Sequence, residues 1–257
     1  MVNSSTCCVQ ALLVRVCKTF FGLAFVALAV TVPTTVKAGV FSVSPVRMYM
    51  TPKDRAIAVT INNDGDDALV MQADVYAWRQ KPGGEEDLIL TEDMILSPPI
   101  LKLAAHSRQV VRLAMLRARP TTDQLTYRLI VREVPEAQPP EKNLQLQLAL
   151  AFSLPVFITP SGAKRQLDCT IERVSADTVR TSCENTGNAY AQLSEFRLSS
   201  ASGEKLALRD SGGYILPSIK RNFDIKRTDG RIPGGKAKLS VALDDGSKQN
   251  FDVSIPD

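Results

Sequence analysis

Hydrophobic and polar side chains alternate most strictly in one segment of the chain, residues 143–154. Every even position from Leu144 to Leu154 is leucine or phenylalanine, whereas the odd positions hold small or polar side chains. Because neighbouring side chains of a strand point to opposite faces, this pattern predicts a β-strand with one wholly apolar face. Burial of the five side chains from Leu144 to Phe152 would contribute roughly 7–15 kcal/mol. Either the domain that carries the strand covers this face, or another protein does.

Shorter alternating segments recur along the chain, and clusters of glycine, proline, asparagine and aspartate separate them. No long segment shows the 3.6-residue apolar period of a helix. The sequence therefore predicts an all-β fold and favours a β-sandwich. A Pro-Ser-Gly turn at residues 160–162 separates two series of strands. We expect an N-terminal domain at residues 39–160 and a C-terminal domain at residues 161–257.

The first 38 residues have the pattern of a cleaved secretory signal peptide. Two basic residues precede an apolar run at residues 19–32, and Val36-Lys37-Ala38 is a small-x-small cleavage pattern. The run is too short for a comfortable membrane span, although an uncleaved anchor is the alternative. We expect an exported protein that is cut after Ala38.

Removal of this leader changes the charge balance. The full chain has a formal net charge of +4, but residues 1–38 hold three basic residues and no acidic ones. The remaining chain has 28 basic against 27 acidic residues. Charge therefore gives no support to nucleic-acid binding.

Two of the five cysteines lie beyond the leader, Cys169 and Cys183. An even pair of cysteines in an exported protein predicts a disulfide, with two buried free thiols as the alternative. Closing a loop of about 15 residues would stabilise the fold by roughly 3 kcal/mol in the chain-entropy model.

Side chains suited to catalysis or metal binding are sparse. His106 is the only histidine, so a serine-histidine-aspartate triad could form only around it, and its neighbours predict a solvated turn. Sites with several histidine ligands are excluded. No glycine-rich phosphate loop follows a strand and opens a helix. The acidic pairs at residues 85–86 and 244–245 are typical of hairpin tips. We expect neither an enzyme nor a bound cofactor or metal.

Several motifs, in order along the chain, resemble the periplasmic pilus chaperones of the chaperone–usher pathway. They are Val43-Ser-Pro-Val-Arg47, Ala77-Trp78, Ser97-Pro-Pro-Ile-Leu-Lys-Leu103, Val110-Val-Arg-Leu113, Tyr127-Arg-Leu-Ile-Val-Arg-Glu-Val-Pro135 and Leu239-Ser-Val-Ala-Leu-Asp-Asp-Gly246. The resemblance covers essentially the whole chain after the leader. It implies two immunoglobulin-like β-sandwich domains set at an angle. It also implies a protein that folds and caps pilus subunits and delivers them to an outer-membrane usher.

The resemblance gives the leucine strand a function. Subunits of this pathway are incomplete sandwiches, and their chaperones lend them the missing strand. Leu144, Leu146, Leu148 and Leu150 fall on the family's donor positions, and Phe152 could extend the row. The resemblance thus favours donation over an ordinary core strand. A slip of one residue would present the glutamine face instead, so the register is strongly specified.

The family's chaperones bind the terminal carboxylate of the subunit with an arginine on the first strand and a lysine on the donor strand. Arg47 matches the arginine, but Pro155 stands where the lysine is expected. We expect Arg128, on the neighbouring strand, to supply the second charge, because an arginine fork suits a carboxylate. The alternative is a structural Arg128 with a solvated head group.

A charge network between the two domains is a further feature of the family. Arg132 and Asp244 match two of its members, and the third, acidic position falls on Asp123 or Gln124. The network is expected to fix the angle between the domains. The missing lysine suggests a divergent branch, similar to the spore-coat-U-type chaperones.

A secreted immunoglobulin-like pilin or adhesin is the alternative function. A pilin carries its donor extension at the mature N-terminus, whereas here the alternating strand lies mid-chain and a second domain follows. This placement favours a chaperone in the periplasm, with pilus subunits and an usher as partners. The free protein could also associate with itself through the apolar strand.

Overall fold

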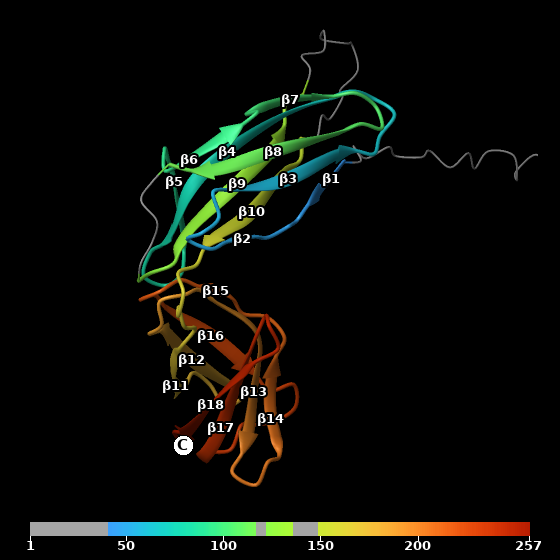
Figure 1. Ribbon diagram of the computed structural model, residues 1–257. Helices are drawn as coiled ribbons and strands as arrows, with labels where there is room; N and C mark the ends of the chain where they lie inside the picture. Colours follow the sequence, from blue (N-terminus) through green and yellow to red (C-terminus); the bar gives the residue numbers. More distant parts are fainter. Residues whose placement is uncertain (1–40, 117–121, 136–148) are drawn as a thin grey trace, which may run out of the picture. The chain divides into compact units, whose positions relative to one another are not determined.

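The computed structural model describes residues 41–116, 122–135 and 149–257 (Figure 1). These residues form 18 β-strands and no helix, which confirms the predicted all-β fold. The described part of the chain accordingly holds no helix long and apolar enough to cross a membrane. The signal peptide predicted for residues 1–38 lies outside the described residues.

The first ten strands form two sheets packed around one core. They are β1 (Phe41–Ser44), β2 (Met48–Met50), β3 (Ala56–Asn63), β4 (Leu69–Gln80), β5 (Glu86–Leu90), β6 (Met94–Ser97), β7 (Ile100–Leu103), β8 (Arg108–Met115), β9 (Leu125–Glu133) and β10 (Ala151–Ile158). One sheet has the strand order β1-β3-β8-β6. The other has the order β2-β10-β9-β4-β5, and β7 also pairs with β4. Alternating apolar side chains of both sheets meet in this core.

The start of the chain is shared between these two sheets. β1 pairs antiparallel with β3, whereas β2 pairs parallel with β10 in the opposite sheet. The chain crosses from one sheet to the other at residues 45–47, where Pro45 offers no N–H to either ladder. Val43, before the crossing, and Met48, after it, are buried in the same core.

The last eight strands form two further sheets around a second core. They are β11 (Leu167–Arg173), β12 (Thr178–Asn185), β13 (Ala191–Ser200), β14 (Lys205–Arg209), β15 (Gly213–Ile215), β16 (Lys220–Lys226), β17 (Gly235–Leu243) and β18 (Lys248–Ile255). The sheet orders are β11-β12-β16 and β14-β13-β17-β18, and β15 pairs with β13. We call the two halves the N-terminal and C-terminal sandwiches. Their division into separate domains at residue 160 stays a prediction.

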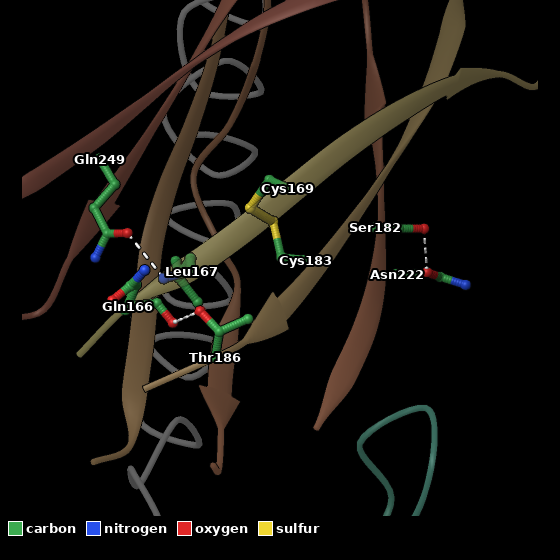
Figure 2. The surroundings of a disulfide bond; sticks show 8 residues. All are labelled: Gln166, Leu167, Cys169, Ser182, Cys183, Thr186, Asn222 and Gln249. Carbon is green, nitrogen blue, oxygen red and sulfur yellow. Dashed lines mark hydrogen bonds between the residues drawn. A yellow bond between two sulfur atoms is a disulfide. The ribbon is translucent and has the colours of Figure 1, made fainter. Parts of the chain in front are cut away.

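The predicted disulfide joins β11 to β12. Cys169 and Cys183 lie directly opposite each other in the ladder, and their Cα atoms are 4.1 Å apart. Figure 2 shows the sulfur–sulfur bond connecting these adjacent strands. Both cysteines are buried in the core of the C-terminal sandwich.

Removing this disulfide should lower the free energy of unfolding. The two cysteines are 14 residues apart in the sequence. A bridge of this span lowers the conformational entropy of the unfolded chain, which stabilises the folded state by about 3 kcal/mol. A Cys169→Ala/Cys183→Ala variant should therefore lose about this much stability in urea denaturation. Dithiothreitol should destabilise the unsubstituted protein by a similar amount and leave the variant unchanged. Equal sensitivity of both proteins to the reductant would contradict the prediction.

Candidate functional site

β10 has an open edge next to the predicted donor segment. It pairs with β9 along its whole length, from Ala151 to Ile158, but with β2 only from Val156 to Ile158 (Figure 1). Among the described strands, none pairs with the other edge of residues 151–155. An unpaired strand edge is a template on which another strand can be added.

The odd-numbered residues of β10 direct their backbone groups toward this edge. The C=O of Leu150 accepts a hydrogen bond from β9, and the N–H of Thr159 donates to β2. Because backbone groups alternate in direction along a strand, Ala151 and Ser153 face the open edge. Pro155 belongs to the same row and contributes only a C=O. A proline is tolerated here because the N–H it lacks would have faced the side away from β9.

The predicted donor residues differ in where they lie. Three of them are outside the described residues, namely Leu144, Leu146 and Leu148. Leu150 is 45% exposed. Phe152 is partly buried, packs against the N-terminal core and makes an edge-to-face contact with Phe41, with ring centroids 5.0 Å apart. Its own sandwich thus covers part of Phe152, and its place in the donor row stays a prediction.

Arg47, the predicted carboxylate anchor, lies at the crossing between β1 and β2. Its Nη1 donates to Asp244 Oδ2 at 2.5 Å and to the hydroxyl of Tyr49 at 3.2 Å. Its Nη2 donates to Gln192 Oε1 at 2.6 Å. Asp244 and Gln192 belong to the C-terminal sandwich, so Arg47 connects the two sandwiches. Its side chain remains 29% exposed.

Asp244 also binds a second arginine, Arg165, which lies just before β11. Arg165 Nη1 donates to Asp244 Oδ1 at 2.9 Å and to Asp245 Oδ2 at 3.2 Å. Its Nη2 donates to the hydroxyl of Tyr190 at 3.0 Å, and its guanidinium lies 4.5 Å from the centre of that ring. Each carboxylate oxygen of Asp244 thus accepts from a different arginine. Sequence reasoning missed Arg165, because it belongs to none of the motifs that carry the family resemblance.

Aromatic rings form the apolar part of this site. Phe157 of β10 stacks on Tyr190 with ring centroids 3.9 Å apart and lies 6.0 Å from Trp78. The hydroxyls of Tyr190 and Tyr49 share a hydrogen bond of 2.8 Å. Burial raises the pKa of Tyr190 above its ordinary value, and the hydrogen bond with Tyr49 acts in the same direction. The phenol therefore stays protonated and can donate to Asp244, 3.2 Å away.

Arg128, the expected second anchor, is enclosed. Its Nη2 donates to Glu86 Oε1 at 2.5 Å, and its guanidinium lies 3.8 Å from the centre of the Trp78 ring. The residue is only 8% exposed, so its head group is not solvated as the alternative had expected. Its role as a carboxylate anchor stays a prediction. Arg47 and Arg128 both lie over the ring of Tyr214, at 5.8 and 5.5 Å from its centroid. The two expected anchors therefore do reach the same aromatic cluster.

Arg132 and Asp244 do not meet, so the predicted network between them is corrected. Arg132 Nη2 bonds to Asp74 on the adjacent strand β4. The start of β9, near Leu125, lies at the junction of the sandwiches, because the preceding residue bonds to the C-terminal sandwich. Arg132 is seven residues further along, about 23 Å away at ~3.3 Å per residue.

Gln124 forms the polar link that replaces this network. Its side-chain amide donates to Thr159 Oγ1 at 2.6 Å, and its Oε1 accepts the N–H of the buried Tyr190 at 2.9 Å. Its backbone N–H donates to the C=O of Asn188 at 3.0 Å. Gln124 is 7% exposed. The third position of the expected network falls on Asp123 or Gln124, and Gln124 makes these contacts through its neutral amide.

The hairpin between β4 and β5 makes a second connection to the C-terminal sandwich. Gln80 donates to the C=O of Tyr214 at 3.0 Å and accepts the N–H of Leu216 at 2.9 Å. Gly84 lies under the side chain of Arg221, where a Cβ would come within 2.1 Å of Arg221 Cδ. The hairpin thus connects the two sandwiches at a place separate from the contacts of Arg47 and Arg165 with Asp244.

The solitary histidine takes no part in these contacts. His106 lies in an exposed turn, with Nε2 3.2 Å from Asp66 Oδ1. Within the described ranges, histidine, cysteine and acidic side chains form no group of three or more that could hold a metal ion.

Residues 40–164 match the family model described as "Pili and flagellar-assembly chaperone, PapD N-terminal domain". None of the curated proteins matches the sequence. The matched residues include Arg47, Arg128 and all of β10, that is, the strand with the open edge and both expected anchors.

Three solved structures are similar to this chain in fold. A chain of the CsuC–CsuE chaperone–tip adhesion subunit pre-assembly complex of Acinetobacter baumannii is 20% identical, with a TM-score of 0.62, over 85% of this chain and 100% of that chain. The E. coli chaperone DraB is 17% identical, with a TM-score of 0.54, over 86% and 98%. A chain of the Salmonella enterica SafA pilin–SafB chaperone complex is 16% identical, with a TM-score of 0.55, over 84% and 96%.

Replacing Gln124 by alanine should destabilise the protein. The substitution leaves the buried N–H of Tyr190 without its acceptor, which costs about 1–3 kcal/mol of unfolding free energy. Urea denaturation followed by fluorescence measures this loss, because the only tryptophan, Trp78, lies in the same buried cluster as Tyr190. Gln72→Ala is the matched control. Among the described residues the side chain of Gln72 bonds only to Asp74 on its own strand, so the substitution should change stability by less than about 0.5 kcal/mol. Equal losses in the two variants would contradict the prediction.

Proposed function

Because residues 40–164 belong to the pili and flagellar-assembly chaperone family, we propose that this protein is a periplasmic chaperone of pilus subunits. The observation that carries the proposal is the open edge of β10 at residues 151–155, which continues the leucine segment. A chaperone of this kind lends a strand to a subunit that lacks one. The matched family is one of assembly chaperones and not of enzymes.

The proposed donor strand is the segment that leads into β10. The even-numbered side chains of β10 enter the N-terminal core from Leu154 onward, and Phe152 is partly covered by that core. Leu150 is the first of the row that is largely exposed. We propose that the row changes its role at this point, from the protein's own core to the groove of a subunit. The proposed donor residues are Leu144, Leu146, Leu148 and Leu150, with Phe152 at the border.

Arg47 is the proposed anchor for the carboxylate at the end of a bound subunit. The next residue, Met48, pairs with Val156, so Arg47 lies beside Pro155 at the closed end of the open edge. A subunit strand that runs along β10 would therefore end near a partly exposed arginine. Arg128 pairs with Pro155 from the β9 side, and this position supports it as the second basic residue. Its bond to Glu86 counts against that role.

The proposed partners are pilus subunits and an outer-membrane usher. Two of the similar structures are complexes that contain a chaperone with a pilin or with a tip adhesion subunit. The disulfide between Cys169 and Cys183 fits an oxidising compartment such as the periplasm. Export would depend on the signal peptide proposed at residues 1–38. The same similarities favour a chaperone over the alternative of a surface pilin or adhesin.

Two glutamates in the leucine row should abolish subunit binding. A Leu146→Glu/Leu148→Glu variant would place two charges in an apolar groove, which costs several kcal/mol. We expect at least a roughly tenfold loss of the soluble complex when the variant is produced in a bacterial periplasm with a pilin-like subunit. Affinity capture of the tagged chaperone and quantification of the co-purified subunit measure this loss.

The glutamine face of the same segment offers a matched control. A Gln145→Glu/Gln147→Glu variant adds the same two charges on the opposite face, and we expect it to retain the subunit. Circular dichroism and thermal unfolding of the free variants test their folding. Unfolding of the free leucine variant would mean that these leucines form the protein's own core. Retention of the subunit by a folded leucine variant would exclude strand donation.

Arg47→Ala should also reduce subunit recovery in the same co-expression experiment. The variant removes a charge-assisted hydrogen bond, an interaction that contributes about 1.5–3 kcal/mol. Arg128→Ala tests the second expected anchor and should reduce recovery as well if Arg128 binds the carboxylate. A loss with Arg47→Ala alone would restrict Arg128 to the junction between the sandwiches. Full recovery with Arg47→Ala would exclude Arg47 as an anchor.

A further inference from the structure

Asp244 lies between two arginines from different parts of the chain. Arg47 donates to Oδ2 at 2.5 Å and Arg165 to Oδ1 at 2.9 Å. The protonated hydroxyl of Tyr190 approaches the same Oδ2 at 3.2 Å. These are the donors that a carboxylate ligand requires, namely two guanidinium groups and a neutral hydroxyl.

The two arginines are held in place by groups other than Asp244. Gln192 and Tyr49 accept hydrogen bonds from Arg47. Asp245 and the hydroxyl of Tyr190 accept from Arg165. If Asp244 moved away, both guanidinium groups would keep these partners. The carboxylate site is therefore built by its surroundings, and Asp244 is its occupant.

The site is also accessible and balanced in charge. The side chains of Arg47 and Arg165 are 29% and 24% exposed, so an external ligand can reach them. Arg47 and Arg165 carry two positive charges, and Asp244 and Asp245 carry two negative charges. If an external carboxylate replaced Asp244, Arg47 would still be paired with a negative charge. Such an exchange avoids the cost of leaving a partly buried arginine unpaired.

We propose that Asp244 is an internal competitor, which occupies the site of Arg47 and Arg165 in the free protein and is displaced by the terminal carboxylate of a bound subunit. The inference rests on the proposed function and adds two elements to it. Arg165 becomes the second basic residue of the carboxylate site, in the place considered above for Arg128. Subunit binding also breaks an ion pair between the two sandwiches, because Arg47 belongs to the N-terminal one and Asp244 to the C-terminal one.

The test uses a small carboxylate in place of a subunit. N-acetylvaline is titrated into the purified exported protein, and the Nε–H signals of Arg47 and Arg165 are followed by ¹⁵N NMR. N-acetylvalinamide, which lacks the charge, serves as the ligand control. The signals are assigned with Arg47→Lys and Arg165→Lys variants. This readout depends on neither a subunit nor the leucine segment.

Asp244→Asn should bind N-acetylvaline more tightly than the unsubstituted protein. Asparagine keeps an oxygen acceptor but competes less well for the arginines, and we expect a dissociation constant about fivefold lower, equivalent to about 1 kcal/mol. Asp245→Asn is the matched control, because Asp245 pairs with Arg165, whereas the carboxylate that pairs with Arg47 is Asp244. It removes the same charge from the neighbouring residue and should change the constant by less than about twofold. Arg47→Ala in the Asp244→Asn protein should remove the gain.

Three outcomes would overturn the inference. They are equal tightening by Asp244→Asn and Asp245→Asn, no tightening by Asp244→Asn, and absence of N-acetylvaline binding to every variant. Equal tightening would identify a general effect of charge, and absence of binding would mean that the arginines serve only the junction. None of the three outcomes bears on strand donation, which the leucine variants test separately.

Discussion

The pairing of β10 with β9 is the interaction on which the other features depend. It runs along all of β10 and fixes which residues face the core, which face the junction and which face the open edge. Through it, Leu154 enters the N-terminal core, Phe157 joins the aromatic cluster and Ser153 offers its backbone to an added strand. Because the side-chain period of a strand is two, a shift of one residue would exchange the two faces.

The junction between the sandwiches combines stacked aromatic rings with arginine side chains that lie against those rings. Phe157 and Tyr190 stack across it, and Arg128 lies against Trp78 in the same cluster. Rings of this kind are attractive surfaces for guanidinium groups, particularly where water is excluded. The polar contacts around Gln124 then satisfy the backbone groups that this packing buries.

The sequence predicted what depends on local periodicity and on motifs. Alternation of apolar residues identified the all-β fold, and the pair of cysteines beyond residue 38 identified the disulfide. The partners of charged side chains were not predictable in this way. Arg132 matches a family motif, yet the direction of β9 carries it to Asp74 instead of Asp244. Arg165 lies in a connecting segment with no periodic pattern, so only the folded chain shows that it shares Asp244 with Arg47.

Pro155 limits how far a strand can be added to β10. Such a strand finds donors and acceptors at Ala151 and Ser153, then an acceptor alone at Pro155, and beyond it the edge is taken by β2. The hydrogen-bonded ladder therefore has a fixed stop at the junction, whereas none of the described strands closes the edge at Ala151. Clients whose strands differ in length would align at the stop and overhang at the far end. A single chaperone could in this way serve subunits of unequal size with one register.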